Sequence, residues 1–221
     1  KYGSRTKIYV NKFKKYVLTK KPSIIEIHNR PTYLLELYKI NKKANYILII
    51  HNDPQNLKGS SSIVERENIL KICKFIYFVS SWVEDKFFEG IEKNNYSNFK
   101  VIYPSISKIK KLSPKKKIIV FSGKLNSAKG FDKFCNAMDK ILNKHKNWKV
   151  MAIGDEPREN IKIKHKNFIY TGWIPHDEVL DIYKTSSITV VPSFWEEPFG
   201  RSSLEAGCLG NAVITSRRGG L

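Results

Sequence analysis

The stretch "ITVVPSFWEEPFGRSSLEAGCLGNAVITS", residues 188–216, contains a strand, a loop, a helix and a second strand. β-Branched runs at 188–193 and 212–216 predict the two strands, and a small-residue pattern of helical period starts near Arg201. A helix that crosses over between two strands favours a parallel sheet with a right-handed connection. The stretch therefore predicts an α/β fold built on parallel strands.

The same alternation of strands and helices extends over the rest of the chain in two series. Strand-like runs of the first series lie at 23–28, 46–51, 75–80 and 100–105, and those of the second at 117–123, 148–154, 168–173, 188–193 and 212–216. Helical patterns fill the gaps. The polar, lysine-rich segment 105–117 separates the two series. We therefore predict two Rossmann-like parallel-sheet domains, residues 1–110 and 111–221, with a cleft between them.

The composition is that of a globular protein. The 221 residues are 41% hydrophobic, and the formal net charge is +20. Such a charge favours anionic partners, among them nucleotide phosphates, nucleic acid and acidic lipid, without choosing between them. The three cysteines form no C-x-x-C pair, so neither a zinc site nor a disulfide framework is expected. No apolar run approaches the ~18 residues of a membrane span, and no signal-peptide pattern is present.

Polar residues that are typical of binding sites follow the predicted strands. His28 and His51 end two successive strands, and each is followed by an asparagine, Asn29 and Asn52. Ligands of open parallel sheets lie beyond the carboxyl ends of the strands, so these residues are expected on the rim of the cleft. A structural role and a catalytic role both remain open for the two histidines.

A glycine-bounded loop, "SGKLNSAKG", follows the strand at 117–123. It places Lys124 and Lys129 after Gly123, where a strand passes into a helix. Lysines and free backbone N–H groups at such a point neutralise phosphate, so a diphosphate site is one interpretation. The other is that two of many lysines fall in a loop by chance. The chain contains neither a Walker A loop nor a G-x-G-x-x-G motif.

The opening stretch contains a second candidate anion site. Gly200 makes a tight turn, after which Arg201, Ser202 and Ser203 occupy the first turn of a helix. The first backbone N–H groups of a helix have no partner within it, and the helix dipole adds to their attraction for an anion.

Two carboxylates accompany this helix start, Glu197 before it and Glu205 within it. A carboxylate would compete with phosphate, but it accepts strong hydrogen bonds from hydroxyl groups, so a sugar or a ribose would account for both. The structural alternatives are an i,i+4 salt bridge between Arg201 and Glu205 and a solvated loop position for Glu197.

At this point the sequence resembles a known family. The segment "EEPFGRSSLEA" is similar to the E-x7-E signature of retaining GT-B glycosyltransferases of group 1, also called family 4, and "SGKLNSAKG" and "AIGDEP" resemble their phosphate loop and G-x-G-P turn. The resemblance implies a GT-B fold, a nucleoside-diphosphate sugar as donor, and a glycan or lipid-linked acceptor. It implies no other cofactor and no obligatory metal. The family's chains are longer, so the resemblance also implies a piece of a longer protein.

The resemblance implies roles for individual positions on the donor side. Glu197 would contact the hydroxyl groups of the donor sugar, and Glu205 would contact the ribose. The rest of the two loops would hold the diphosphate: Gly123, Lys124, Lys129, Gly200, Arg201, Ser202 and Ser203. Lys124 stands where the family has arginine, which forfeits a bidentate contact with phosphate.

On the acceptor side, the resemblance places His51 near the reacting centre, with His28 and Asn52 as less critical neighbours. We therefore predict sugar transfer with retention of configuration, in bacterial cell-surface polysaccharide or lipopolysaccharide synthesis. The enzyme would work in the cytoplasm, peripheral on the inner face of the membrane. There the basic, aromatic-rich segment 5–21 would either dock on anionic lipid or form an ordinary helix with a solvated lysine face.

Two alternatives remain for the function. A nucleotide-sugar 2-epimerase would use the same fold and donor pocket without an acceptor. A basic nucleic-acid-binding or membrane-binding module would use no donor. Because the lysines are spread over every segment and not gathered on one surface, no nucleic-acid partner is expected.

Overall fold

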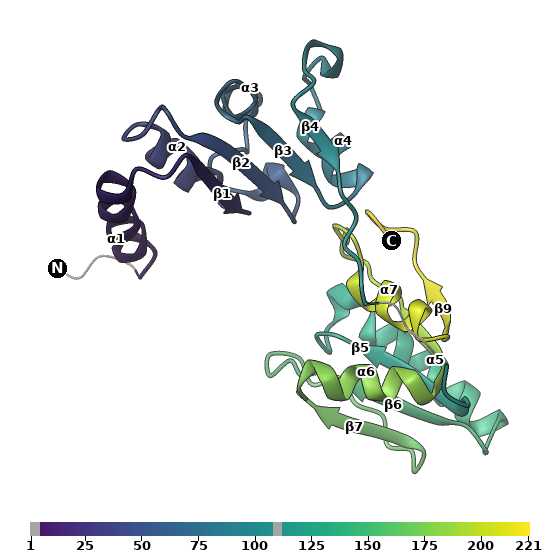
Figure 1. The fold of residues 1–221 in the computed structure, drawn as a ribbon. Coiled ribbons are helices and arrows are strands. Elements are labelled where there is room, and N and C mark those ends of the chain that lie inside the picture. Colours follow the sequence, from purple (N-terminus) through teal and green to yellow (C-terminus); the bar gives the residue numbers. More distant parts are fainter. Residues whose placement is uncertain (1–4, 108–111) are drawn as a thin grey trace. The chain divides into compact units, whose positions relative to one another are not determined.

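The computed structural model describes residues 5–107 and 112–221, and the chain divides into two compact units (Figure 1). Unit 1 is Lys1–Tyr103 and unit 2 is Pro104–Leu221. The sequence placed the division near residue 110, in the polar segment 105–117. Of that segment, 105–107 and 112–115 have no regular structure, and 108–111 lie outside the described residues.

Unit 1 is a parallel sheet with strand order β1-β2-β3-β4. Its strands are β1 (Ile24–His28), β2 (Asn45–Ile50), β3 (Phe75–Phe78) and β4 (Phe99–Val101). Its helices are α1 (Arg5–Lys20), α2 (Pro31–Tyr38), α3 (Ile63–Ile72) and α4 (Ser81–Phe88), with single turns η1 (Pro54–Asn56) and η2 (Lys93–Asn95) in the loops. Because each strand lies beside its predecessor on the same side, right-handed connections place α2, α3 and α4 on one face of the sheet.

Two helices of unit 1, α3 and α4, begin at capping serines. Ser62 accepts from the N–H of Glu65, whose side chain accepts in return, and this capping box starts α3. Ser80 accepts from the N–H of Val83 and starts α4. This cap ends β3 at Phe78, two residues before the predicted strand end at 80.

No helix of the described residues is long and apolar enough to cross a membrane.

Unit 2 is a parallel sheet with strand order β7-β6-β5-β8-β9. Its strands are β5 (Lys116–Ser122), β6 (Lys149–Ile153), β7 (Phe168–Gly172), β8 (Ser186–Val191) and β9 (Ala212–Thr215). Its helices are α5 (Phe131–Lys144), α6 (His176–Thr185) and α7 (Arg201–Cys208), with the single turn η3 (Ser127–Lys129) before α5. The predicted α/β class with two parallel, Rossmann-like sheets is thereby confirmed.

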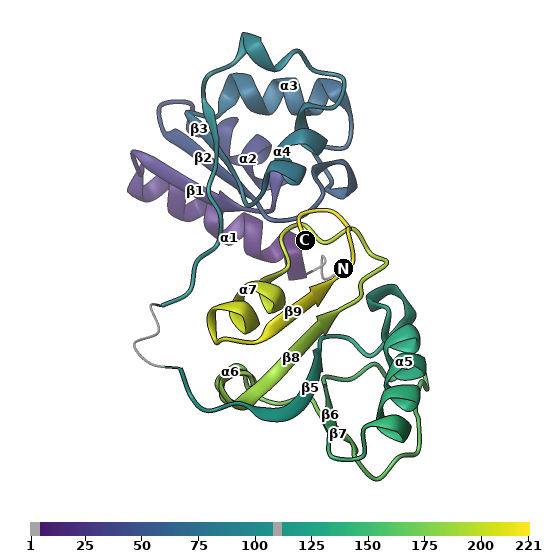
Figure 2. The same cartoon turned by 90° about the vertical axis from the view of Figure 1, so that its right-hand side faces the viewer.

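The core of unit 2 has two layers, one on each face of the sheet. Ile119 and Phe121 of β5 pack with Phe131 and Phe134 of α5. The intervening residue, Val120, belongs to the opposite layer, which contains residues of α6 and α7. Figure 2 shows α5 on one side of the sheet and α6 with α7 on the other. Side chains of a strand alternate between its faces, so the continuous apolar run of β5 supplies both layers.

Lys115, just before β5, ties two helix ends together. Its ammonium group donates to the carbonyls of Tyr183 and Lys184 at 3.1 Å each, near the end of α6, and to that of Leu209 at 2.5 Å, just after α7. The last carbonyls of a helix have no partner within it and carry the negative end of its dipole, so one cation stabilises both ends.

We expect Lys115→Met to lower the free energy of unfolding of unit 2 by about 1–3 kcal/mol, because three carbonyls lose a charged donor. Lys117→Met, at an exposed position of β5, is the matched control and should change stability far less. Urea unfolding followed by far-UV circular dichroism measures both. Equal stability of the two variants would contradict the capping role of Lys115.

Candidate functional site

The strand order of unit 2 changes direction at β5, which has β6 and β7 on one side and β8 and β9 on the other. At such a switch point the connections of the two adjacent strands leave in opposite directions, and a crevice opens beyond the strand ends. The connections in question are 123–130 after β5 and 192–200 after β8. They are the two loops that the sequence analysis selected.

The backbone joins these two loops directly. The N–H groups of Phe194 and Trp195 both donate to the carbonyl of Ala128, at 3.0 and 2.9 Å. Gly130 has φ 72°, and a Cβ atom there would lie 2.0 Å from the carbonyl oxygen of Pro192. Only glycine allows both this conformation and this approach. The glycine at the end of "SGKLNSAKG" is therefore needed to bring the loops into contact.

The charged side chains of the two loops also meet. The ammonium group of Lys129 forms an ion pair with Oε1 of Glu197, and Ser193 Oγ donates to the same oxygen at 2.9 Å. The Glu197 side chain is 13% exposed, so it is not a solvated loop residue. The lysine that the sequence assigned to a diphosphate and the carboxylate that it assigned to a sugar thus contact each other.

The start of α7 has the expected position but uses one of its N–H groups internally. Gly200 is left-handed, with φ 85°, and α7 begins at Arg201. The N–H and Oγ of Ser203 both donate to the carbonyl of Gly200, at 3.1 and 2.6 Å. In this structure the N–H of Ser203 therefore belongs to the first turn of the helix, whereas the sequence analysis offered it to an anion together with that of Ser202.

Glu205 is a buried residue of α7 itself and is 5% exposed. Its Oε1 accepts from Arg201 Nη2 at 3.0 Å, which is the i,i+4 salt bridge considered as the structural alternative. His176 Nε2 lies 3.2 Å from the same oxygen. His176 begins α6, after the short loop 173–175 that follows β7, and the sequence analysis missed it. The signal was available, because it follows a predicted strand end in "YTGWIPH".

Two hollows lie beside these residues, and His176 lines both. The first, of about 400 Å³, is lined by Ser122, Gly123, Lys124, Ile153, Gly154, Asp155, Trp173, Ile174, His176 and Val179. The second, of about 370 Å³, is lined by Ser105, Ile106, Ser107, His176, Leu180, Lys184, Arg201, Glu205 and Leu209. Trp173 is 72% exposed at the first hollow. It is a second residue that the sequence analysis missed.

The loop after β6 supports the loop that carries the lysines. Gly154 has φ 125°, and a Cβ atom there would lie 2.0 Å from the carbonyl oxygen of Gly123. Glu156 accepts from Asn126 Nδ2 at 3.3 Å, and Asn126 in turn accepts from the N–H of Lys129 at 3.0 Å. Arg158 donates to both oxygens of Glu156, at 2.6 and 2.7 Å, and together these hydrogen bonds lower the pKa of Glu156 to about 2.

The predicted residues of unit 1 lie at the ends of two neighbouring strands. His28 is the last residue of β1, and His51 and Asn52 directly follow β2. Asn29 has a left-handed φ of 56°, which asparagine tolerates, and its Oδ1 accepts from the N–H of His51 at 3.2 Å. This contact holds the two strand ends together and brings the two histidines side by side.

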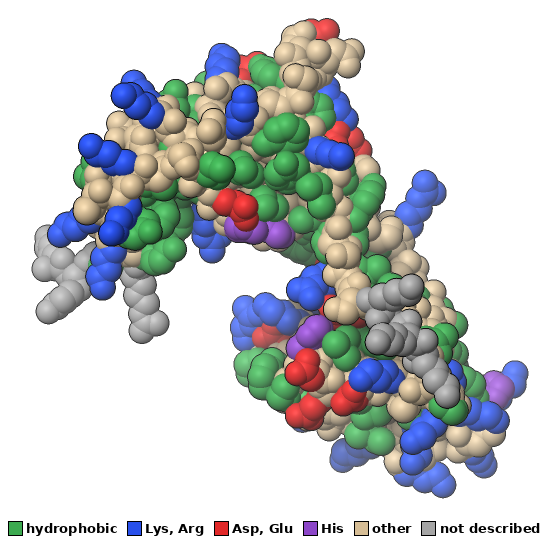
Figure 3. All heavy atoms as spheres, viewed as in Figure 1, with side chains coloured by type: hydrophobic (Ala, Val, Ile, Leu, Met, Phe, Trp, Pro, Cys, Tyr) green, Lys and Arg blue, Asp and Glu red, His purple; other side chains and the backbone are tan. Residues whose placement is uncertain are grey.

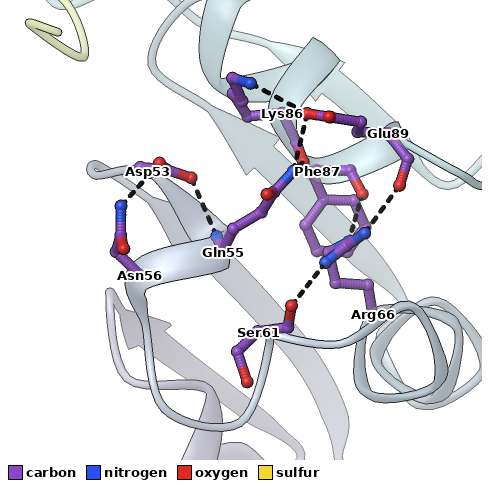
Figure 4. Close-up of polar contacts among 8 residues, drawn as sticks. All are labelled: Asp53, Gln55, Asn56, Ser61, Arg66, Lys86, Phe87 and Glu89. Carbon is purple, nitrogen blue, oxygen red and sulfur yellow. Dashed lines mark hydrogen bonds and ion pairs between the residues drawn. The ribbon is translucent and has the colours of Figure 1, made fainter.

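The rest of the loop after β2 is held by a buried arginine. Arg66 of α3 is 3% exposed, and its guanidinium donates to the carbonyls of Phe87 and Glu89 at 2.7 Å and of Ser61 at 3.1 Å (Figure 4). Gln55 adds a hydrogen bond to Glu89, at 2.9 Å. Backbone carbonyls rather than carboxylates thus satisfy the buried charge, and the loop that follows His51 is fixed to the end of α4.

Among the residues that the structure describes, no group of three or more histidine, cysteine, aspartate or glutamate side chains is arranged to hold a metal ion. In the described part of the chain, Cys73 and Cys135 are buried and Cys208 is exposed, and all three are free thiols.

Comparison with known proteins identifies the family. Residues 103–221, which include all of unit 2, match the family described as Glycosyl transferases group 1. The chain belongs to this family. YtcC of Bacillus subtilis is 26% identical over 227 residues, which cover 89% of this chain and 56% of YtcC. The lipopolysaccharide 1,2-N-acetylglucosaminetransferase of Salmonella typhimurium is 21% identical over 224 residues, which cover 93% of this chain and 57% of that protein.

Solved structures show the fold of this group 1 chain. The crystal structure of Anabaena HepE in complex with UDP-glucose is similar with a TM-score of 0.72 at 15% identity, covering 96% of this chain and 64% of HepE. A glycosyltransferase from Rickettsia africae gives a TM-score of 0.75 at 18% identity, covering 100% of this chain and 65% of that one. The fold is GT-B, as the sequence predicted. The chain spans a little over half the length of YtcC and of the Salmonella transferase.

The contacts of Glu156 predict how stability depends on pH. Because the folded-state pKa of Glu156 lies near 2, well below its usual value, its contribution is fully present above about pH 5 and is lost as the pH falls toward 2. We expect Glu156→Gln to destabilise unit 2 at pH 6 and to have little effect near pH 2. Urea unfolding at the two pH values tests this. The exposed Asp139→Asn variant of α5 is the control, and a pH-independent effect of Glu156→Gln would contradict the prediction.

Proposed function

We propose that this protein is a retaining glycosyltransferase of the family 4 type that takes its sugar from a nucleoside-diphosphate donor. The observation that carries the proposal is the contact between the lysine loop and the glutamate loop at the switch point of unit 2, in a chain of the group 1 family. Glu197 and Glu205 have the spacing of the E-x7-E signature. The complex of the fold relative HepE with UDP-glucose supports a donor of this class.

In this proposal the two loops divide the donor between them. Lys124, Lys129 and the N-terminus of α7 at Ser202 neutralise the diphosphate, and Glu197 accepts hydrogen bonds from hydroxyl groups of the sugar. The ammonium group of Lys129 would then contact both the diphosphate and Glu197. Its ion pair with Glu197 already holds it beside that carboxylate. The charge that develops on the leaving diphosphate is stabilised by groups that are in place before the reaction.

The nucleoside is proposed to bind in the hollow of about 400 Å³ beyond β5, β6 and β7. The exposed indole of Trp173 offers an aromatic face to the base, and at Gly123, where a Cβ atom would meet nothing within 4 Å, the backbone is open. Glu205, which is held by Arg201 and lies 3.2 Å from His176 Nε2, is proposed to accept from the ribose. No metal and no further cofactor are part of this proposal.

Unit 1 is proposed to serve the acceptor, with His51 as its main polar residue and His28 and Asn52 beside it. A lipopolysaccharide sugar transferase among the relatives supports a glycan or lipid-linked acceptor of the bacterial cell surface. Helix α1 carries exposed Tyr9, Tyr16 and Leu18 among its lysines, a composition that favours peripheral docking on an anionic membrane from the cytoplasmic side.

We expect Glu197→Gln to reduce sugar transfer by about 100-fold or more, because the carboxylate that orders Lys129 and the sugar hydroxyls is lost. The neighbouring Glu196→Gln, which removes only the exposed pair with Arg218, is the matched control and should retain activity. Circular dichroism verifies that both variants fold, and turnover is measured with a panel of nucleoside-diphosphate sugars. Wild-type turnover by the Glu197 variant would overturn its assignment.

Product analysis separates this proposal from the 2-epimerase alternative. A transferase forms a glycoside only when an acceptor is present, with the anomeric configuration of the donor. An epimerase consumes the nucleotide sugar without an acceptor.

A further inference from the structure

Three titratable side chains of unit 1 form a hydrogen-bonded chain. Glu26 Oε1 lies 2.6 Å from His28 Nε2, and His28 Nδ1 lies 3.0 Å from His51 Nε2. The two imidazole rings are inclined by only 18° with centroids 5.2 Å apart. The rings therefore lie nearly in one plane and meet edge to edge through these nitrogens. In Figure 3 the histidines of unit 1 form one purple patch at its surface.

The strand geometry produces this arrangement. Glu26 and His28 are two residues apart on β1, so their side chains lie on the same face of the strand. β2 is parallel to β1. His51 directly follows β2, and the hydrogen bond from its N–H to Asn29 Oδ1 fixes it beside the end of β1. The chain of contacts runs from a carboxylate on the sheet face to an imidazole beyond the strand ends.

We propose that Glu26 and His28 are positioning residues that decide which ring nitrogen of His51 accepts a hydrogen bond. The proposal rests on the proposed function, because it makes His51 Nδ1 the atom that receives a hydroxyl group of the bound sugar or acceptor.

The neutral form of the chain follows from donor and acceptor roles. The ionised Glu26 only accepts, so His28 carries its hydrogen on Nε2 and presents a lone pair on Nδ1. His51 must then donate from Nε2, which leaves a lone pair on its Nδ1. In this state His51 accepts a hydrogen bond from a hydroxyl group.

One added proton reverses the polarity of His51. We assign this proton to His28, because its Nε2 lies 2.6 Å from the carboxylate oxygen of Glu26. Burial and the neighbouring His28 also lower the pKa of His51. Protonated His28 donates from Nε2 to Glu26 and from Nδ1 to His51 Nε2. Neutral His51 then carries its hydrogen on Nδ1 and becomes a donor at the atom that was an acceptor. The chain gains one proton and its net charge rises from −1 to zero, with no other group changed.

Other charged groups near these strand ends have partners of their own. Arg30 Nη1 donates to the carbonyl of Asn29 at 3.1 Å. Asp53 accepts from the N–H of Gln55 at 2.9 Å and from Asn56 Nδ2 at 2.8 Å. Arg30 and Asp53 carry charges of opposite sign, so their effects on the two histidines oppose each other. Glu26 is the group that contacts the imidazole chain, at His28 Nε2.

The experiment is a pH series of two-bond ¹H–¹⁵N spectra of this chain labelled with ¹⁵N-histidine, with His28 and His51 assigned by His28→Asn and His51→Asn. We expect the first proton to switch neutral His51 from the Nε2–H to the Nδ1–H tautomer. In Glu26→Gln the midpoint of this step should fall by about 0.2–0.7 pH unit, the range for a half-exposed pair. Glu92→Gln, an equal charge change at an exposed position of unit 1, should leave it unchanged.

The outcomes separate this inference from the proposed function. Direct protonation of His51 without an Nδ1–H intermediate, or equal midpoints in Glu26→Gln and wild type, would overturn the inference even if the protein transfers sugar. If the tautomer switch occurs, the midpoint of the acid limb of sugar transfer should coincide with it and move with Glu26→Gln. A switch in a protein that neither binds nor turns over nucleotide sugars would refute the proposed function and the hydroxyl-binding role of His51 together.

Discussion

The carbonyl of Ala128 is the point on which the candidate site of unit 2 depends. Two successive N–H groups of the loop after β8 donate to it, and the loop after β5 supplies it. Strand order makes this contact available, because the two loops leave adjacent strands at the switch point of the sheet. Lys129 follows Ala128 directly and Glu197 lies two residues after Trp195, so the backbone contact also determines which charges meet.

Both carboxylates of the candidate site, Glu197 and Glu205, have partners that compensate their charge. A carboxylate near the N-terminus of a helix would repel a phosphate, and a largely buried carboxylate requires compensation. Lys129 and the hydroxyl of Ser193 provide that compensation for Glu197, while Arg201 provides it for Glu205. Each carboxylate therefore keeps a defined orientation in a protein of net charge +20.

Unit 1 fixes its polar residues by other means. A buried arginine with backbone carbonyl partners holds the loop after β2, and an asparagine in a left-handed turn joins the ends of β1 and β2. Neither device places a fixed opposing charge on His51. Glu26 acts on the His51 imidazole only through His28. Under this indirect influence, the addition of a single proton to the chain of contacts changes the tautomer of His51.

The sequence by itself determined the succession of strands and helices along the chain, the class of fold and the loops that carry the chemistry. Side-chain periodicity and capping residues are local properties, so they can be recognised without the tertiary structure. It selected Lys129 and Glu197 but assigned them to separate parts of a ligand. It offered the N–H of Ser203 to an anion, and it passed over Trp173, His176 and the link between Glu26 and His28. Only the tertiary structure decided those pairings. Lys129 and Glu197 lie in the loops after β5 and β8, and His176 and Glu205 lie on α6 and α7, so their contacts depend on strand order and register, which no local pattern records. The N–H of Ser203 is used within its own turn, and Glu26 and His28 lie on one strand, where the folded side-chain conformations bring them together.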